Sequence, residues 1–469
     1  MYDDSIAFLP ARELGRRLHA KQLSPIELAE TYLARLERWG PTFNCVVTLT
    51  RERALREARR AEQEIMRGRI RGPLHGVPYG AKDLLATADY PTSWGAAPYR
   101  GQRFDRDATV IQRLEAAGAV LVAKLAMVEL AGGMGYNQAN ASFTGPGITP
   151  WNTKYWSGGS SSGSGAAVAA GLVPFAIGSE TWGSIMAPAT FCGVSGLRPT
   201  YGRVSRHGAM ALSWSMDKLG SLCRTADDCG LVLAAIAGAD AADPSAVTQP
   251  YAYRPARPAG RRWRLGVLKD AATGAQEDVR RNFETSLEVV RNFADLVMDL
   301  ELPDLPFGQA AGTIIDAEGA SAFEDLIHDG RANELAAPED RTGGYSGLVV
   351  LAKDYLKALR LRRQMVVAFD EFLKPLDGIV HPTRATPAYP LDKPFREGWP
   401  GVRGGPGLSG AENLCGTPGI GIPNGFGVEN LPTGLQFSAR AFDENVVLTL
   451  AAEFQRRTDW HARRPPLDA

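Results

Sequence analysis

The chain of 469 residues contains little cysteine and histidine, and neither is spaced for metal binding. Its five cysteines form no C-x-x-C pair, and its six histidines are scattered between positions 19 and 461. Zinc sites bring such residues together at short and regular spacings. We therefore expect reduced thiols, a cytoplasmic location, no metal and no other cofactor.

The sequence also has no surplus of either charge. Lys plus Arg and Asp plus Glu each total 52. Binding to a phosphate backbone or to an anionic membrane surface relies on excess positive charge. The composition therefore disfavours nucleic acid and the membrane surface as partners.

A long hydrophobic run is absent as well. The longest apolar stretch, 166–178, has about 13 residues and contains Pro174, whereas a membrane-spanning helix needs about 20. The first ten residues, MYDDSIAFLP, carry two acids where a secretory signal would be basic. We expect no membrane segment, and we expect 166–178 to form a buried helix followed by a buried strand.

What is present is typical of a folded α/β protein, with 44% apolar and 22% charged residues. Residues 24–27 read Ser-Pro-Ile-Glu, a capping box with proline at the first helical position. Further helices are predicted over 51–68 and 349–373, and 107–130 predicts a helix, a glycine stop and a short buried strand. The proline-rich range 240–262 predicts a surface connection rather than a domain boundary.

The run GGSSSGSG at 158–165 could pass for a flexible linker. A linker would be flanked by polar sequence, but this run leads directly into the apolar stretch 166–178. Glycines allow close backbone approach, serines supply hydroxyls, and a helix that begins here would present free N–H groups. A functional loop, a linker and an ordinary tight turn all remain open at this point.

Three short motifs offer other chemistries. Residues 159–163 match G-x-S-x-G, which would make Ser161 the nucleophile of an α/β-hydrolase elbow, but the preceding 149–157 is a poor strand candidate. A phosphate loop would need a lysine that the run lacks. Ser215 and Lys218 match S-x-x-K, but the companion motifs S-D-N and K-T-G do not accompany it.

A longer pattern settles the choice. GGSSSGSGAAVAAGLVPFAIGSETWGSIMAPA, residues 158–189, closely resembles the core of the amidase signature family, and similar pieces lie in order along most of the chain. The resemblance implies an α/β fold with a central mixed β-sheet surrounded by α-helices. It also implies one amidase domain over 1–469, with a signature core at about 72–230 and a substrate-pocket insertion at 300–400.

The same resemblance implies a Ser, cis-Ser, Lys triad. Lys82 falls on the catalytic lysine, Ser160 on the bridging serine and Ser184 on the nucleophile. A lysine acts as a base only when neutral, so its pKa must fall by roughly three units from about 10.4. We therefore expect Asp83 to point away from the amine. The backbone N–H groups of Thr181, Trp182, Gly183 and Ser184 are the family's oxyanion donors.

Three positions depart from the family's usual pattern: Glu180 replaces Asp, Trp182 replaces Gly and Met186 replaces Arg. Glu180 must therefore find a partner other than residue 186, or contact water. His75 is interpreted as a turn residue and Gln436 as a buried hydrogen-bonding group on a C-terminal strand.

The expected function is hydrolysis of an amide, with anilides, esters and carbamates (urethanes) as related substrates. Trp182, Met134 and Met186 are the candidate substrate-binding residues, and together with Trp94 they favour an uncharged, apolar or aromatic small molecule. The expected assembly is a monomer or homodimer. The alternative is the glutamine-hydrolysing subunit of a tRNA-dependent amidotransferase, which would need partner subunits. An inactive scaffold is disfavoured because all three triad positions are retained.

Overall fold

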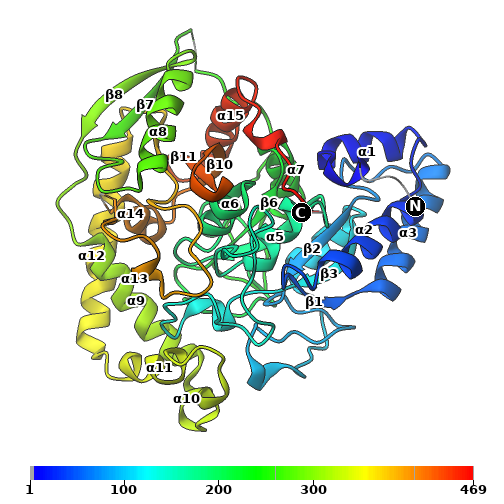
Figure 1. Cartoon of the computed structure of the whole chain (residues 1–469), viewed down its shortest axis with the longest axis horizontal. Coiled ribbons are helices and arrows are strands. Elements are labelled where there is room, and N and C mark those ends of the chain that lie inside the picture. Colours follow the sequence, from blue (N-terminus) through cyan, green and yellow to red (C-terminus); the bar gives the residue numbers. More distant parts are fainter. Residues whose placement is uncertain (1–4, 259, 406, 468–469) are drawn as a thin grey trace.

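The structure is a computed structural model that describes residues 5–258, 260–405 and 407–467. Over these residues eleven strands form a single sheet in the order β1-β3-β2-β4-β6-β5-β10-β11-β9-β7-β8. Helices surround it (Figure 1). The sheet is mixed: β2 is parallel to β3 and β4, whereas β4, β6, β5, β10, β11 and β9 pair antiparallel in turn. The predicted fold class is confirmed.

The strands are β1 (Val46–Leu49), β2 (Pro78–Lys82), β3 (Val120–Leu125), β4 (Phe175–Glu180), β5 (Ser195–Arg198), β6 (Lys218–Cys223), β7 (Trp263–Leu268), β8 (Ala294–Leu300), β9 (Gly378–Pro382), β10 (Gly419–Phe426) and β11 (Pro432–Ser438). The helices are α1 (Ala11–His19), α2 (Pro25–Trp39), α3 (Arg51–Met66), α4 (Thr109–Ala116), α5 (Ser162–Ala169), α6 (Met186–Cys192), α7 (Ala226–Ile236), α8 (Glu277–Val290), α9 (Phe307–Ala322), α10 (Glu324–His328), α11 (Asp340–Leu348), α12 (Ala352–Leu373), α13 (Phe395–Gly398), α14 (Leu408–Cys415) and α15 (Glu444–Gln455).

Local sequence signals place several of these elements. Ser24 caps α2, because its Oγ accepts hydrogen bonds from the N–H groups of Ile26 (3.2 Å) and Glu27 (3.3 Å). The range 107–130 resolves into α4, a turn at Gly118 with φ +81°, and β3. Helix α12 begins later than its apolar pattern suggests, because Leu351 lies ahead of the helix and is 56% exposed.

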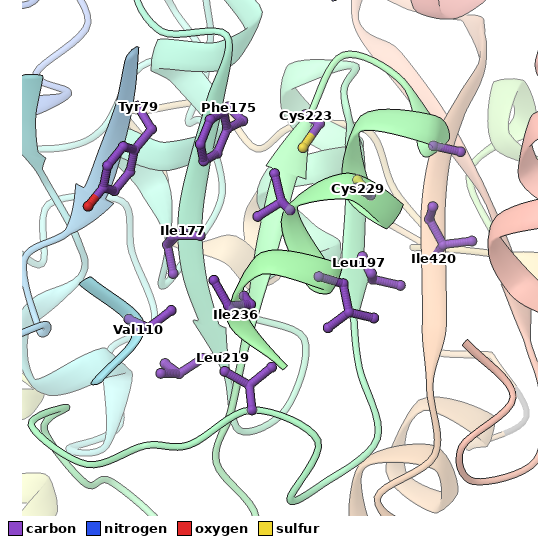
Figure 2. Close-up of a cluster of buried hydrophobic side chains, with 14 of the residues drawn as sticks. Tyr79, Val110, Phe175, Ile177, Leu197, Leu219, Cys223, Cys229, Ile236 and Ile420 are labelled. Carbon is purple, nitrogen blue, oxygen red and sulfur yellow. The ribbon is translucent and has the colours of Figure 1, made fainter. Parts of the chain in front are cut away.

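Strand β4 divides the core into two faces. Phe175 and Ile177 pack in one cluster with α7, whereas Ala176, between them, packs in a second cluster with α5. This follows from the alternation of side chains along a strand. Figure 2 shows the first cluster, in which the rings of Phe175 and Tyr79 stack with centroids 5.3 Å apart. Helix α5 is buried along its whole length, as its apolar composition predicts.

The connection between α7 and β7 contains the proline-rich range 240–262, and no helix or strand is found in its described part. It leads into β7, which pairs with β9 and so extends the same sheet. Across the described ranges, no helix is long and apolar enough to cross a membrane.

Candidate active site

Lys82 is the last residue of β2, and its side chain is fully buried. Its Nζ donates hydrogen bonds to three hydroxyl oxygens: Ser160 Oγ at 2.7 Å, Ser179 Oγ at 2.9 Å and Ser161 Oγ at 3.1 Å. Since β2 and β4 are parallel neighbours, their carboxyl ends bring Lys82 and the segment after Glu180 to one edge of the sheet. The structure therefore joins Lys82 to Ser160 directly.

The environment of Lys82 favours its neutral form. Burial lowers the pKa of Lys82 to about 7, while the more distant carboxylates of Asp217 and Glu180 act to raise it. The adjacent Asp83 faces elsewhere: its carboxylate pairs with Lys124 at 2.7 Å and accepts a hydrogen bond from Ser93 N at 2.8 Å. The expectation that Asp83 points away from Lys82 is confirmed.

The glycine-serine run forms an ordered, buried loop before α5. Gly158 has φ +87°, and the peptide bond between Gly159 and Ser160 is cis. Ser160 O accepts a hydrogen bond from Val128 N at 3.0 Å, and Ser161 N donates to Ser184 O at 3.2 Å. The run is thus bonded to the segment that carries Ser184, and the linker interpretation is excluded.

Residues 181–185 connect β4 to α6 and carry the predicted nucleophile. Ser184 is 8% exposed, and Gly183 before it adopts φ +83°, which favours glycine. Within the described part of the chain, no hydrogen bond is recorded for the N–H groups of Trp182, Gly183 and Ser184. These three donors are available to a developing oxyanion.

Glu180 has a partner that its local sequence does not reveal. Its Oε1 pairs with Arg198 Nη1 at 3.0 Å, and its Oε2 accepts hydrogen bonds from the N–H groups of Ile185 (2.8 Å) and Met186 (3.1 Å). Burial acts to raise the pKa of Glu180, but Arg198 and Lys218 hold it below its ordinary value. Glu180 therefore ties the turn after Ser184 to β5.

Arg198 continues this network into the C-terminal half. Its Nη2 pairs with Glu412 at 3.2 Å, and Glu412 also contacts His381 Nε2 at 3.1 Å and accepts a hydrogen bond from Gln436 Nε2 at 2.8 Å. Gln436 lies on β11 and is 2% exposed. Its predicted role as a buried hydrogen-bonding group is confirmed.

Lys218 supports the same segment from β6. Its Nζ donates to Thr181 O at 3.2 Å and to Asn413 Oδ1 at 3.0 Å, and burial lowers its pKa to about 7. Thr181 Oγ1 in turn donates to Asp217 Oδ1 at 2.5 Å. The backbone before Ser184 is therefore fixed from two sides.

A cavity of about 420 Å³ opens beside Trp182. Trp182 is 40% exposed, and its Nε1 donates to Ser409 Oγ at 3.1 Å. Other aromatic walls are Tyr389, Phe395 and Trp399. The remaining lining residues are Ala271, Thr273, Ala275, His381, Pro382, Thr383, Arg384, Ala385, Thr386, Arg396, Val402, Arg403, Gly404, Gly405, Gly407, Leu408, Ser409 and Gly410.

The other candidate substrate contacts lie apart from this lining. Met134 is buried beneath α11, where its Sδ would lie 2.6 Å from a Cβ built on Gly344. Met186 begins α6 and faces Gly421 of β10. Trp94 packs against Tyr99, with ring centroids 4.6 Å apart. Of the proposed substrate contacts, the structure places Trp182 at the cavity.

The alternative motifs do not assemble. No strand precedes Ser161, whose Oγ instead donates to Ser179 O at 3.1 Å, so the elbow interpretation is wrong. Ser215 Oγ accepts from Arg362, away from the contacts of Lys218. His75 lies in the turn before β2, where its Nδ1 accepts from Arg71 N at 3.2 Å. Among the described residues, no three His, Cys, Asp or Glu side chains gather as a metal site would require.

Comparison with known proteins agrees with this arrangement. A family model for amidases matches residues 27–448. Over 477 residues the chain is 36% identical to one of the subunits of the glutamyl-tRNA(Gln) amidotransferase of Chloroflexus aggregans, in an alignment that covers 96% of each protein.

Two solved structures are similar over nearly the whole chain. The native peptide amidase of Stenotrophomonas maltophilia has 30% identity and a TM-score of 0.83, covering 98% of this chain and 99% of that one. A 6-aminohexanoate cyclic dimer hydrolase complexed with substrate has 25% identity and a TM-score of 0.83, with coverage of 98% and 99%. The chain therefore belongs to the amidase family of amide-hydrolysing enzymes.

Proposed function

We propose that this chain cleaves the C–N bond of an amide through an acyl-enzyme on Ser184. The observation that carries the proposal is the amine of Lys82, which is fully buried, lies 2.7 Å from Ser160 Oγ and has a pKa lowered to about 7. A neutral amine in that position can accept a proton at neutral pH. Ser160 and Ser184 are linked to it through the bonded loop 158–162.

In the acylation step, Lys82 takes the proton of Ser160 as Ser160 takes the proton of Ser184. The Ser184 oxygen forms a bond to the substrate carbonyl carbon, and the carbonyl electron pair moves to its oxygen. The N–H groups of Trp182, Gly183 and Ser184 are the proposed donors to this oxyanion, with Thr181 as a further candidate from the sequence. The same relay then returns the proton to the leaving nitrogen as the C–N bond breaks.

In the deacylation step, water replaces the amine. Lys82, again neutral, accepts the water proton through Ser160 as the water oxygen bonds to the acyl carbon. The Ser184 ester bond then breaks, and Ser184 regains its proton. The products are a carboxylic acid and a free Ser184, so neither a metal nor a redox partner enters the balance.

The cavity supports a substrate with an aromatic or apolar part, because Trp182, Tyr389, Phe395 and Trp399 form its walls. Anilides, esters and carbamates are proposed as related substrates, since each passes through the same oxyanion. The printed names of the relatives extend from a peptide amidase to a hydrolase of a cyclic amide dimer.

A second candidate is the glutamine-hydrolysing subunit of a tRNA-dependent amidotransferase. It is supported by the 36% identity to one component of such an enzyme over 96% of both chains. In that role the chain would pass ammonia to a partner rather than release it. The bulky Trp182 at the cavity and the equal numbers of acidic and basic residues, 52 each, favour the first proposal.

A panel of 4-nitroanilides, esters, carbamates and glutamine tests both candidates. The purified chain is expected to hydrolyse neutral aryl amides, and Ser184→Ala is expected to lose at least about 10³-fold in kcat. Circular dichroism and the unfolding midpoint of Ser184→Ala should match those of the parent. Residual turnover in a correctly folded Ser184→Ala protein would remove Ser184 from the proposed role.

A further inference from the structure

The cavity beside Trp182 has three positively charged side chains in its lining, Arg384, Arg396 and Arg403, and none of its described lining residues is Asp or Glu. Arg396 and Arg403 are exposed, and Arg396 contacts Glu397 at 3.4 Å. Because the whole chain has no net charge, this excess of positive charge is local. A ligand that enters the cavity meets a positive potential.

Arg384 differs from the other two by its burial and its position. Its side chain is partly buried, and its Nη1 would lie 3.2 Å from a Cβ built on Gly183, next to the proposed nucleophile. Within the described ranges, no ion pair or side-chain hydrogen bond is recorded for Arg384. Withdrawing a guanidinium from water without a counter-ion costs free energy unless a ligand supplies one.

Building on the proposed function, we propose that Arg384 binds a carboxylate of the substrate and so determines specificity. The guanidinium presents parallel N–H donors that match a carboxylate, and this charge-assisted pair is stronger in a partly desolvated site. The substrate class is an amide that carries a carboxylate close to the scissile carbonyl, such as the monoamide of a dicarboxylic acid. This class differs from the uncharged substrate that the sequence favours.

The same lining distinguishes this class from free glutamine. Glutamine carries an α-ammonium group beside its carboxylate, and an ammonium group needs an acidic partner when it leaves water. The described lining supplies no such carboxylate, and three guanidinium groups would repel it. The substrate is therefore an anion without an adjacent ammonium group.

Paired substrates that differ only in charge test the proposal. Glutaric acid mono-4-nitroanilide is compared with pentanoic acid 4-nitroanilide, and 4-(acylamino)benzoate with the corresponding neutral anilide, so that the carboxylate lies on either side of the scissile bond. The parent is expected to prefer one anion over its neutral counterpart. Arg384→Gln is expected to lower this kcat/KM ratio by about tenfold or more, mainly through KM, and Arg384→Lys to restore part of it.

Arg396→Gln is the matched control, because Arg396 lines the same cavity but is exposed and contacts Glu397. It is expected to change the ratio by less than about threefold, as a screened surface charge would. An equal fall in Arg396→Gln and Arg384→Gln would overturn the assignment to Arg384. An equal loss on anionic and neutral substrates in Arg384→Gln would also overturn it, since that result indicates a contribution to the transition state.

A binding measurement separates this proposal from the proposed function. Calorimetry with Ser184→Ala protein should detect glutarate but not its neutral diamide, and adding Arg384→Gln should weaken glutarate binding by about tenfold or more. Binding that survives when no substrate is turned over would leave Arg384 assigned while the proposed reaction fails. Glutarate binding that is unchanged by Arg384→Gln, beside normal turnover of neutral anilides, would overturn the role of Arg384 alone.

Discussion

Two buried lysines, Lys82 and Lys218, lie near the segment that carries Ser184, and burial lowers the pKa of each to about 7. Their contacts differ. Lys82 meets three hydroxyl oxygens, whereas Lys218 meets a backbone carbonyl oxygen and the amide oxygen of Asn413. A carbonyl oxygen has no proton to give, so Lys218 is suited to holding the backbone and Lys82 to accepting a proton.

The rate of hydrolysis should therefore depend on the charge of Lys82. Below a pH of about 7 the amine gains a proton, so kcat/KM for a neutral anilide should fall by about tenfold per pH unit on the acid side and level off above it. A pH–rate profile measures the midpoint. In Lys218→Met the midpoint should stay in place even if the plateau falls, and a midpoint that disappears with Lys218 would transfer the titration to that residue.

Trp182 gives a second prediction at the level of one side chain. Trp182→Gly removes an aromatic wall and the hydrogen bond to Ser409, while the residue is 40% exposed and contributes little to the core. The kcat/KM preference for aromatic over aliphatic amides should fall by roughly two- to tenfold, as expected for loss of an aromatic contact. The unfolding midpoint should change little, and an unchanged preference would remove Trp182 from substrate binding.

At the scale of elements, α5 is tightly enclosed. A Cβ added to Gly163 would lie 2.4 Å from Cys45 O and 2.6 Å from Ala126 N. Because these are backbone atoms, they cannot rotate away. The serine loop before α5 is positioned by this close contact with the segment around Ala126.

Gly163→Ala should therefore destabilise the fold by about 1–3 kcal/mol or more, as overpacking does, and lower activity by displacing Ser160. Gly312→Ala in α9 is the matched control, since nothing lies within 4 Å of an added Cβ there. It should be neutral or stabilising by roughly 0.5–1 kcal/mol. Urea unfolding measures both, and similar stabilities for the two variants would contradict the close packing of α5.

The sequence predicts the elements and triad positions well, because their signals are local or lie within one long motif. It does not predict the pairing of Glu180 with Arg198, because β4 and β5 are joined only through β6 in the sheet. The positions of Met134 and Met186 were inferred from neighbouring motif residues, but their side chains turn toward α11 and β10. Arg384 was missed, although a basic residue directly after the buried strand β9 is the available signal.

At the scale of the molecule, the triad and the cavity are supplied by one chain. Lys82, Ser160 and Ser184 come from the first half, and most of the cavity lining comes from residues 381–410. These segments meet because β9, β11 and β10 continue the sheet from β5. The charge network from Glu180 to His381 joins the two halves beneath the cavity.

The isolated chain is therefore expected to hydrolyse aryl amides without partner subunits. Light scattering after size-exclusion chromatography gives the oligomeric state, with a monomer or homodimer expected. Ammonia release from glutamine should be at least about tenfold slower than anilide hydrolysis. Activity that appears only with added amidotransferase subunits and tRNA would instead support the second candidate.

The neighbours Lys82 and Asp83 have a consequence for engineering this scaffold. Their side chains diverge at the end of β2, so an amine without a counter-ion and a carboxylate that needs one coexist one residue apart. Lys124 makes this possible by occupying the acid on the far side. Any redesign that neutralises Lys124 should therefore neutralise Asp83 as well, or a stranded anion beside the base will seek the nearest cation.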